Sequence, residues 1–141
     1  HTEGSTKRAF LVSEAIEGYS IEDIRKENLD WDKYLPTIQL MGEQLYAMHQ
    51  YRIQHGALYP DHMFLNLDTN QFRLIDFERS RVCFSSRTAI ENDFRQFLRR
   101  AEGIPTEAID LLLEPYQMQY RKLIEKLKSK HYFPKIEGIN E

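Results

Sequence analysis

The residues best suited to chemistry in this 141-residue chain lie in one stretch and in a short segment that follows it. Residues 55–65 read His-Gly-Ala-Leu-Tyr-Pro-Asp-His-Met-Phe-Leu, and residues 76–78 read Asp-Phe-Glu. Imidazoles and carboxylates of this kind can bind a metal ion or transfer a proton. The candidate side chains are His55, Asp61, His62, Asp76 and Glu78.

A hairpin and a long helix would position these side chains. Two short strands, residues 63–67 and 72–75, are joined by a polar turn and deliver Asp76 at the end of the second strand. A long amphipathic helix is predicted over residues 36–52, because Ile38, Met41, Leu45 and Met48 recur every three or four residues. Its proline would lie in the first turn, where the missing N–H costs nothing.

The other elements are mostly helical. Residues 9–16 form a predicted strand, and Ser20 with Asp23 forms a variant capping box that begins a short helix. Residues 79–88 lack periodicity and are predicted to be a surface loop. Three further helices are expected, one capped by Asn92 or Asp93, one over residues 107–114 and one over residues 116–130. The chain is therefore mainly α with a small antiparallel β-hairpin, and not a series of βαβ units.

Charge and cysteine content exclude several function classes. The net charge of −3 provides no global basic field for nucleic acid. The single Cys83 excludes a disulfide framework and fits a reducing compartment, so a cytoplasmic location is expected. No apolar run reaches the length of a membrane span. The chain begins with His1, which indicates that it starts inside a longer polypeptide.

The C-terminal helix is basic. The C-terminal run that includes this helix carries Arg121, Lys122, Lys126, Lys128, Lys130 and Lys135, with one acid, Glu125, among them. A solvated helical face is the commoner meaning of such a run. The alternative is peripheral contact with the inner membrane or with a phosphorylated glycolipid, through this helix.

Three segments together carry a resemblance to a known family. Residues 10–16, 55–65 and 74–81 resemble the C-terminal lobe of protein-kinase-like phosphotransferases, specifically the InaA-type branch of the lipopolysaccharide (heptose/Kdo) kinase family. The resemblance implies a protein-kinase-like (α+β) fold. Residues 1–19 would be the last strand of the N-terminal lobe and the hinge, and residues 20–141 the helical C-terminal lobe. An N-terminal lobe that precedes His1 would be its partner.

The resemblance also implies ATP and Mg²⁺ as cofactors. The backbone of Glu14 and Ile16 would face the adenine, and Asp76 would hold the Mg²⁺ that bridges the ATP phosphates. His55 and Phe77 would stack into a hydrophobic spine. Asp93, opening a helix, would accept backbone amides from the loop at residues 55–65.

Three positions depart from the family pattern. Ala57 stands where such kinases place the aspartate that orients the attacking hydroxyl and takes its proton, and a methyl group can do neither. His62 stands where an asparagine helps to bind a second Mg²⁺, although imidazole suits transition metals better. Glu78 replaces a glycine. Asp61 and Glu78 are the candidate surrogate bases.

Three hypotheses remain at this point. The first is an ATP-dependent phosphotransferase that acts on a sugar hydroxyl, with a sugar or glycolipid acceptor. The second is a pseudokinase, a regulatory nucleotide-binding module in envelope or stress physiology. The third is a structural lobe that functions only beside its other half. Asp76 as a turn-capping carboxylate, and His55 and His62 as structural histidines, are the alternatives to the chemical roles.

Overall fold

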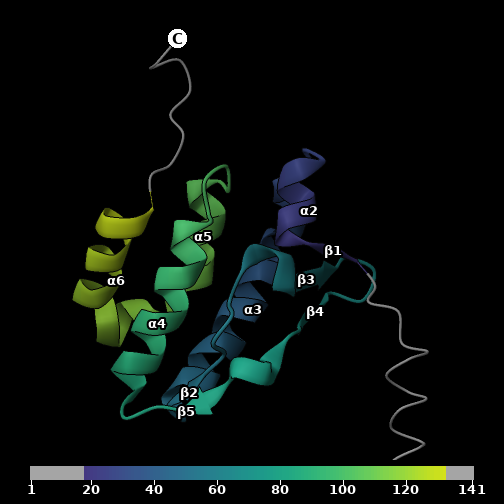
Figure 1. Cartoon of the computed structure of the whole chain (residues 1–141). Helices are drawn as coiled ribbons and strands as arrows, with labels where there is room; N and C mark the ends of the chain where they lie inside the picture. Colours follow the sequence, from purple (N-terminus) through teal and green to yellow (C-terminus); the bar gives the residue numbers. More distant parts are fainter. Residues whose placement is uncertain (1–17, 133–141) are drawn as a thin grey trace, which may run out of the picture.

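The computed structural model describes residues 18–132. The longest helix in this part of the chain, α3 (Trp31–Gln50), lies in the middle of the structure (Figure 1). The helix begins at Trp31, earlier than predicted, because the Asp30 side chain caps it by accepting the Asp32 N–H at 3.1 Å. Pro36 therefore lies inside the helix, where its missing N–H removes one backbone hydrogen bond, and not in the first turn.

α4 (Ser86–Arg99) and α5 (Thr106–Leu113) pack against α3, and α6 (Gln117–His131) packs against α4 (Figure 1). The α3–α5 crossing is close, since a Cβ on Gly42 would lie 2.5 Å from the carbonyl oxygen of Leu112. Their shared core includes Met41, Leu45, Phe94, Phe97, Leu112, Leu123, Ile124 and Leu127. Among residues 18–132, no helix has the length and apolar character needed to cross a membrane.

The start of α4 corrects one expectation. Neither Asn92 nor Asp93 caps a helix; Ser85 does, because its Oγ accepts the Thr88 N–H at 3.1 Å. Asp93 instead lies well inside α4 and is fully buried. A cap placed near Asp93 was wrong because Ser85 supplies the same hydrogen bond two turns earlier.

The last helices are close to the predicted ranges. α5 ends at Leu113, and Pro115 lies in the 3₁₀ turn η3 (Glu114–Tyr116) that joins it to α6. Within α6, Tyr120 has non-helical backbone angles, so the helix is kinked there.

A three-stranded antiparallel sheet covers one end of α3. Strands β3 (Met63–Asn66) and β4 (Gln71–Leu74) form the predicted hairpin, and β1 (Tyr19–Ser20) pairs with the other edge of β3. The short helix α2 (Ile21–Lys26) begins with the predicted capping box. In that box Asp23 N–H donates to Ser20 Oγ at 3.0 Å, and Ser20 N–H donates to Asp23 Oδ2 at 3.1 Å.

A second, two-stranded ribbon lies at the opposite end of α3 (Figure 1). It consists of β2 (Ile53–Gln54) and β5 (Arg81–Val82), paired antiparallel. Residues 79–88 are therefore not a simple surface loop, because they contain a strand and the start of α4. Two-residue strands carry too little periodicity to be recognised from sequence. The predicted strand at residues 9–16 lies outside the described residues.

Candidate functional site

A buried carboxylate clamps the start of the loop at residues 55–65. Asp93 Oδ2 accepts the His55 backbone N–H at 2.8 Å, and Oδ1 accepts the Gly56 N–H at 3.0 Å. The Nε2 of His49, on α3, lies 2.8 Å from the same Oδ2. Asp93 is fully buried, so these donors replace the water that a carboxylate needs.

His49 extends the network through Tyr116 to η3, the turn that leads into α6. The Tyr116 hydroxyl lies 2.7 Å from His49 Nδ1. Burial, and then the negative charge of Asp93, raise the pKa of Tyr116 well above its ordinary value. The hydroxyl therefore stays protonated and donates to Nδ1, which leaves the imidazole proton on Nε2 to face Asp93.

Neither His49 nor Tyr116 was predicted as a site residue. His49 lies four residues after Leu45 and continues the buried stripe of α3, which was expected to pass through Met48. A histidine on an otherwise apolar stripe was the only signal for it, and a buried polar residue of that kind needs a partner.

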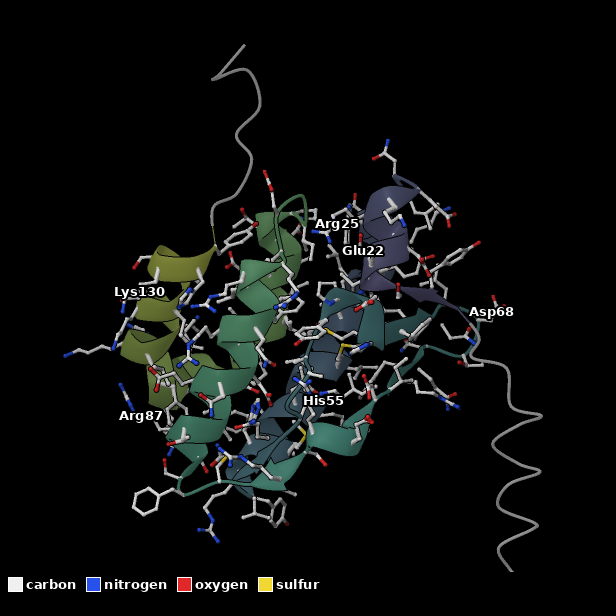
Figure 2. All side chains as sticks on the ribbon, viewed as in Figure 1. Glu22, Arg25, His55, Asp68, Arg87 and Lys130 are labelled. Carbon is white, nitrogen blue, oxygen red and sulfur yellow. The ribbon has the colours of Figure 1, made fainter. Side chains whose placement is uncertain are left out.

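The His55 side chain braces the loop from inside. Its Nε2 lies 2.9 Å from the Ile75 carbonyl oxygen, and its Nδ1 accepts the Ala57 N–H at 3.1 Å. Both contacts are satisfied only by the neutral ring with its proton on Nε2, and burial lowers the pKa of His55. The ring packs on Phe77, with 4.5 Å between centroids. Figure 2 shows His55 enclosed near the middle of the molecule.

Gly56 lets the loop pass close to the segment after β4. Its φ is +92°, and a Cβ there would lie 2.3 Å from the Arg79 carbonyl oxygen. Any other residue would meet both a backbone strain and a clash. The loop and the turn at residues 76–78 are therefore packed directly against each other.

A pocket of about 190 Å³ lies where the two segments meet. It is lined by Ala57, Tyr59, Asp76, Glu78 and Arg79. Asp76 has left-handed backbone angles, φ 66° and ψ 60°, just before the 3₁₀ turn η2 (Phe77–Arg79). Such angles are uncommon for a residue with a side chain and mark positions that the surrounding structure holds in place.

His62 is aimed at Asp76 by a hydrogen bond on its other nitrogen. It lies in the 3₁₀ turn η1 (Pro60–His62), and its Nδ1 is 2.8 Å from the Ala57 carbonyl oxygen. Nδ1 must donate in that contact, so Nε2 faces Asp76 Oδ2 at 3.5 Å and Asp61 Oδ1 at 3.9 Å. The structure thus brings His62, Asp76 and Asp61 together, although the Asp61 side chain is 64% exposed.

The comparison with known families decides the class of the protein. The model of the lipopolysaccharide kinase (Kdo/WaaP) family matches residues 1–116. The chain belongs to this family. No curated protein matches it.

Because the chain belongs to a kinase family, we compare the residues of the pocket with those that hold Mg²⁺ and phosphates in kinases. Mg²⁺ is commonly held by one or two carboxylates together with substrate phosphates and water. Within the described ranges no three His, Cys, Asp or Glu side chains converge as a metal site. Asp76, with Glu78 on the same pocket, fits the first arrangement, since phosphates would supply the remaining oxygens. Imidazole is a poor Mg²⁺ ligand, so His62 fits less well.

The pocket also contains residues that the sequence reasoning missed. Arg79 and Tyr59 line the pocket, and the Tyr59 ring is covered by the Arg100 guanidinium at 4.0 Å from its centroid. Glu78 lines the pocket, whereas Phe77, expected to stack into a spine with His55, contacts the His55 ring but is 45% exposed. Glu14 and Ile16, expected at an adenine, lie outside the described residues.

Proposed function

We propose that the chain is the C-terminal lobe of an InaA-type lipopolysaccharide kinase with a protein-kinase-like (α+β) fold, and that it transfers phosphate from ATP to a sugar hydroxyl. The observation that carries the proposal is the placement of Asp76. Its carboxylate lines the pocket at the end of a hairpin, in a left-handed conformation, beside a loop that Asp93 clamps.

In this proposal each charged group of the pocket has one task. Asp76 holds Mg²⁺, which when bound neutralises phosphate charge. The Arg79 guanidinium lines the same pocket and can contact a phosphate oxygen. Glu14 and Ile16, outside the described residues, would contact the adenine through their backbone, and an N-terminal lobe preceding His1 would complete the site.

The acceptor hydroxyl has two candidate bases in place of the aspartate. Glu78 lines the pocket, whereas Asp61 is largely exposed and lies near His62 Nε2, so Glu78 is the better placed. Phosphoryl transfer through a loose transition state asks little of a base, and positioning contributes most of the rate. Loss of the aspartate at Ala57 is therefore compatible with activity.

One observation favours a second candidate, a pseudokinase. Ala57 is only 4% exposed, and its methyl group lines the pocket where a base would stand. A protein that binds Mg²⁺ and ATP there without transferring phosphate would act as a regulatory module, in envelope or stress physiology. The two candidates share nucleotide binding and differ in turnover.

Nucleotide binding is tested by thermal unfolding of the full-length protein with ATP, with and without Mg²⁺. We expect Mg²⁺-dependent stabilisation, about 2.7 kcal/mol at a hundred-fold excess over Kd, because ligand binds only the folded state. Asp76→Asn should abolish it, while the exposed Glu125→Gln on α6, matched in charge change, should retain it. Absence of stabilisation in the wild-type protein would overturn both candidates.

Turnover then separates the two candidates, with radiolabelled ATP and lipopolysaccharide as substrates. Label transfer that disappears in Glu78→Gln and persists in Asp61→Asn assigns the base to Glu78. The reverse result assigns it to Asp61. If the wild-type protein binds nucleotide without transferring label, and Ala57→Asp gains label transfer, the protein is a pseudokinase.

A further inference from the structure

The strand β5 continues into a segment whose apolar side chains face outward. Val82 is 64% exposed and Phe84 is 92% exposed, whereas Cys83 between them is 5% exposed. This alternation is that of an extended strand, with its outer face carrying the two apolar side chains. Cys83 faces inward, with its Sγ 3.1 Å from Gln54 Oε1.

An exposed aromatic residue, Tyr51, lies at the end of α3 that leads into β2. β2 and β5 pair with Ile53 opposite Val82, and the Cys83 N–H donates to the Arg52 carbonyl oxygen at 2.7 Å. Tyr51 precedes Arg52 in the chain and is the C-cap residue of α3, with φ −88° and ψ 10°. Tyr51 is 75% exposed.

Three exposed arginines lie within five residues of these apolar side chains in the sequence. Arg52, Arg81 and Arg87 are all exposed, and in the described part of the chain their side chains form no ion pair or hydrogen bond. The sequence contains no acidic residue from 79 to 90 or from 51 to 60. Arg87 lies at the start of α4, which packs against β2, at the lower left of Figure 2.

We propose that this surface, formed by Tyr51, Arg52, Arg81, Val82, Phe84 and Arg87 and called here the ribbon surface, docks on a bilayer that contains anionic lipids. Aromatic and aliphatic side chains insert at the boundary between headgroups and acyl chains. Unpaired arginines bind the lipid phosphates, and each one near an anionic membrane raises the partition coefficient about five-fold.

The ribbon surface is close to the pocket along the chain. Arg79 lines the pocket, and Arg81 lies two residues further, so the chain between them spans at most about 7 Å. Docking would hold the pocket at a membrane surface, where a lipopolysaccharide acceptor is presented. In this respect the inference deepens the proposed function and rests on it.

The basic helix α6 is the less suitable membrane surface. Lys128 is already paired with Asp110, at 2.7 Å. Its fully exposed apolar residue, Met118 at 97%, is a single side chain with no exposed aromatic neighbour among the large hydrophobic residues of α6. The ribbon surface combines three exposed apolar residues with three unpaired arginines, and α6 does not.

The experiment is co-sedimentation of the full-length protein with vesicles of phosphatidylcholine alone or mixed with phosphatidylglycerol. We expect binding only to the mixed vesicles and its loss at high salt, because exposed charges are screened there. Val82→Ser with Phe84→Ser should lower binding at least ten-fold. Arg81→Gln with Arg87→Gln should lower it about 25-fold, two factors of five.

Matched changes on α6 are the controls. Met118→Ser removes an equally exposed apolar residue, and Lys126→Gln with Lys130→Gln removes two charges; both should change binding less than two-fold. Loss of binding in the α6 variants, absence of binding to mixed vesicles, or equal binding to neutral vesicles would overturn the proposal. A dimer in sedimentation velocity that Phe84→Ser dissociates would overturn it in favour of contact between two copies.

The two proposals fail separately. ATP stabilisation without vesicle binding removes only the ribbon surface proposal, and vesicle binding without ATP stabilisation removes only the kinase proposal. The ribbon variants should keep the wild-type melting temperature and circular dichroism, which shows that lost binding is not lost folding.

Discussion

The two halves of the loop at residues 55–65 are held in different ways. In the first half, the backbone of His55 and Gly56 is bound by Asp93, and every one of these residues is buried. In the second half, the side chains of Asp61 and His62 are 64% and 17% exposed, and they face Asp76, which is 43% exposed.

This difference explains why residues in the exposed half can be replaced without a change in the fold. A buried carboxylate with three donors cannot lose a partner cheaply, because the remaining groups have no water to replace it. The exposed groups can hydrogen-bond to water instead, so folding does not constrain which residues occupy these positions. Ala57, although buried, lines the pocket, and His62 faces the pocket-lining Asp76, while the clamp behind them is complete.

Removing the clamp should have the largest effect. Asp93→Ala leaves the amides of His55 and Gly56 and the Nε2 proton of His49 without an acceptor. We expect a loss of about 4 kcal/mol in the free energy of unfolding, as for a broken buried pair. Urea denaturation of the full-length protein measures it. The control is Asp61→Ala in the exposed half, which should cost no more than about 0.5 kcal/mol. Equal costs for the two variants would remove the contrast between the halves.

The close approach of the loop to the turn after β4 should have the next largest effect. Gly56→Ala adds a Cβ 2.3 Å from the Arg79 carbonyl oxygen, at a φ of +92°. We expect a cost of about 3 kcal/mol in stability, from strain and overpacking together. Gly103→Ala is the control, since its φ is +91° but its Cβ would meet only the flexible Arg25 side chain. It should cost about 1 kcal/mol. A cost for Gly56→Ala no greater than that of the control would show that the crossing is loose.

The pH dependence of stability follows from the neutral state of His55. Burial lowers its folded pKa below the unfolded value of about 6.5, so below that pH the unfolded chain binds a proton that the folded chain does not. Stability from this group is therefore complete above about pH 6.5 and falls as the pH drops. Melting temperatures from pH 8 to pH 5.5 measure the slope, and His55→Gln should reduce it.

The protonation of His55 can also be measured directly, which keeps the prediction testable if His55→Gln folds poorly. Ring ¹⁵N spectra of the wild-type protein should show that His55 keeps the neutral Nε2–H form to a lower pH than an unperturbed imidazole, because burial lowers its pKa. Protonation of the ring with an ordinary pKa would contradict the bracing role, because the Ala57 N–H already occupies Nδ1.

The sequence predicted the parts of this arrangement that depend on local pattern. The β3–β4 hairpin follows from alternation and a polar turn, and the capping box at Ser20 follows from hydrogen-bonding side chains three residues apart. The stripe of α3 follows from helical spacing, and Met48 packs against the core as expected; only the buried His49 was left out of it. These signals lie within a few residues of each other.

The parts that failed depend on contacts between distant segments. The ribbon of β2 and β5 joins strands of two residues each, and its pairing is invisible to periodicity. The His49–Asp93–Tyr116 network joins three helices, and the helix that Asp93 was expected to open begins at Ser86. The cap at Asp30 outweighed Pro36 as a start signal for α3, because one lost hydrogen bond can be offset by packing along the whole helix.

The smallest effect on stability should come from the residue most important to the proposed function. Asp76 holds φ 66° and ψ 60°, angles that glycine adopts freely and alanine does not. Asp76→Gly should change stability by no more than about 0.5 kcal/mol, and Asp76→Ala should be about 1 kcal/mol less stable than the glycine variant. Both should lose Mg²⁺-dependent stabilisation by ATP. If Asp76→Gly itself costs more than about 2 kcal/mol, the carboxylate braces the turn. The exposed half would then be built like the buried one.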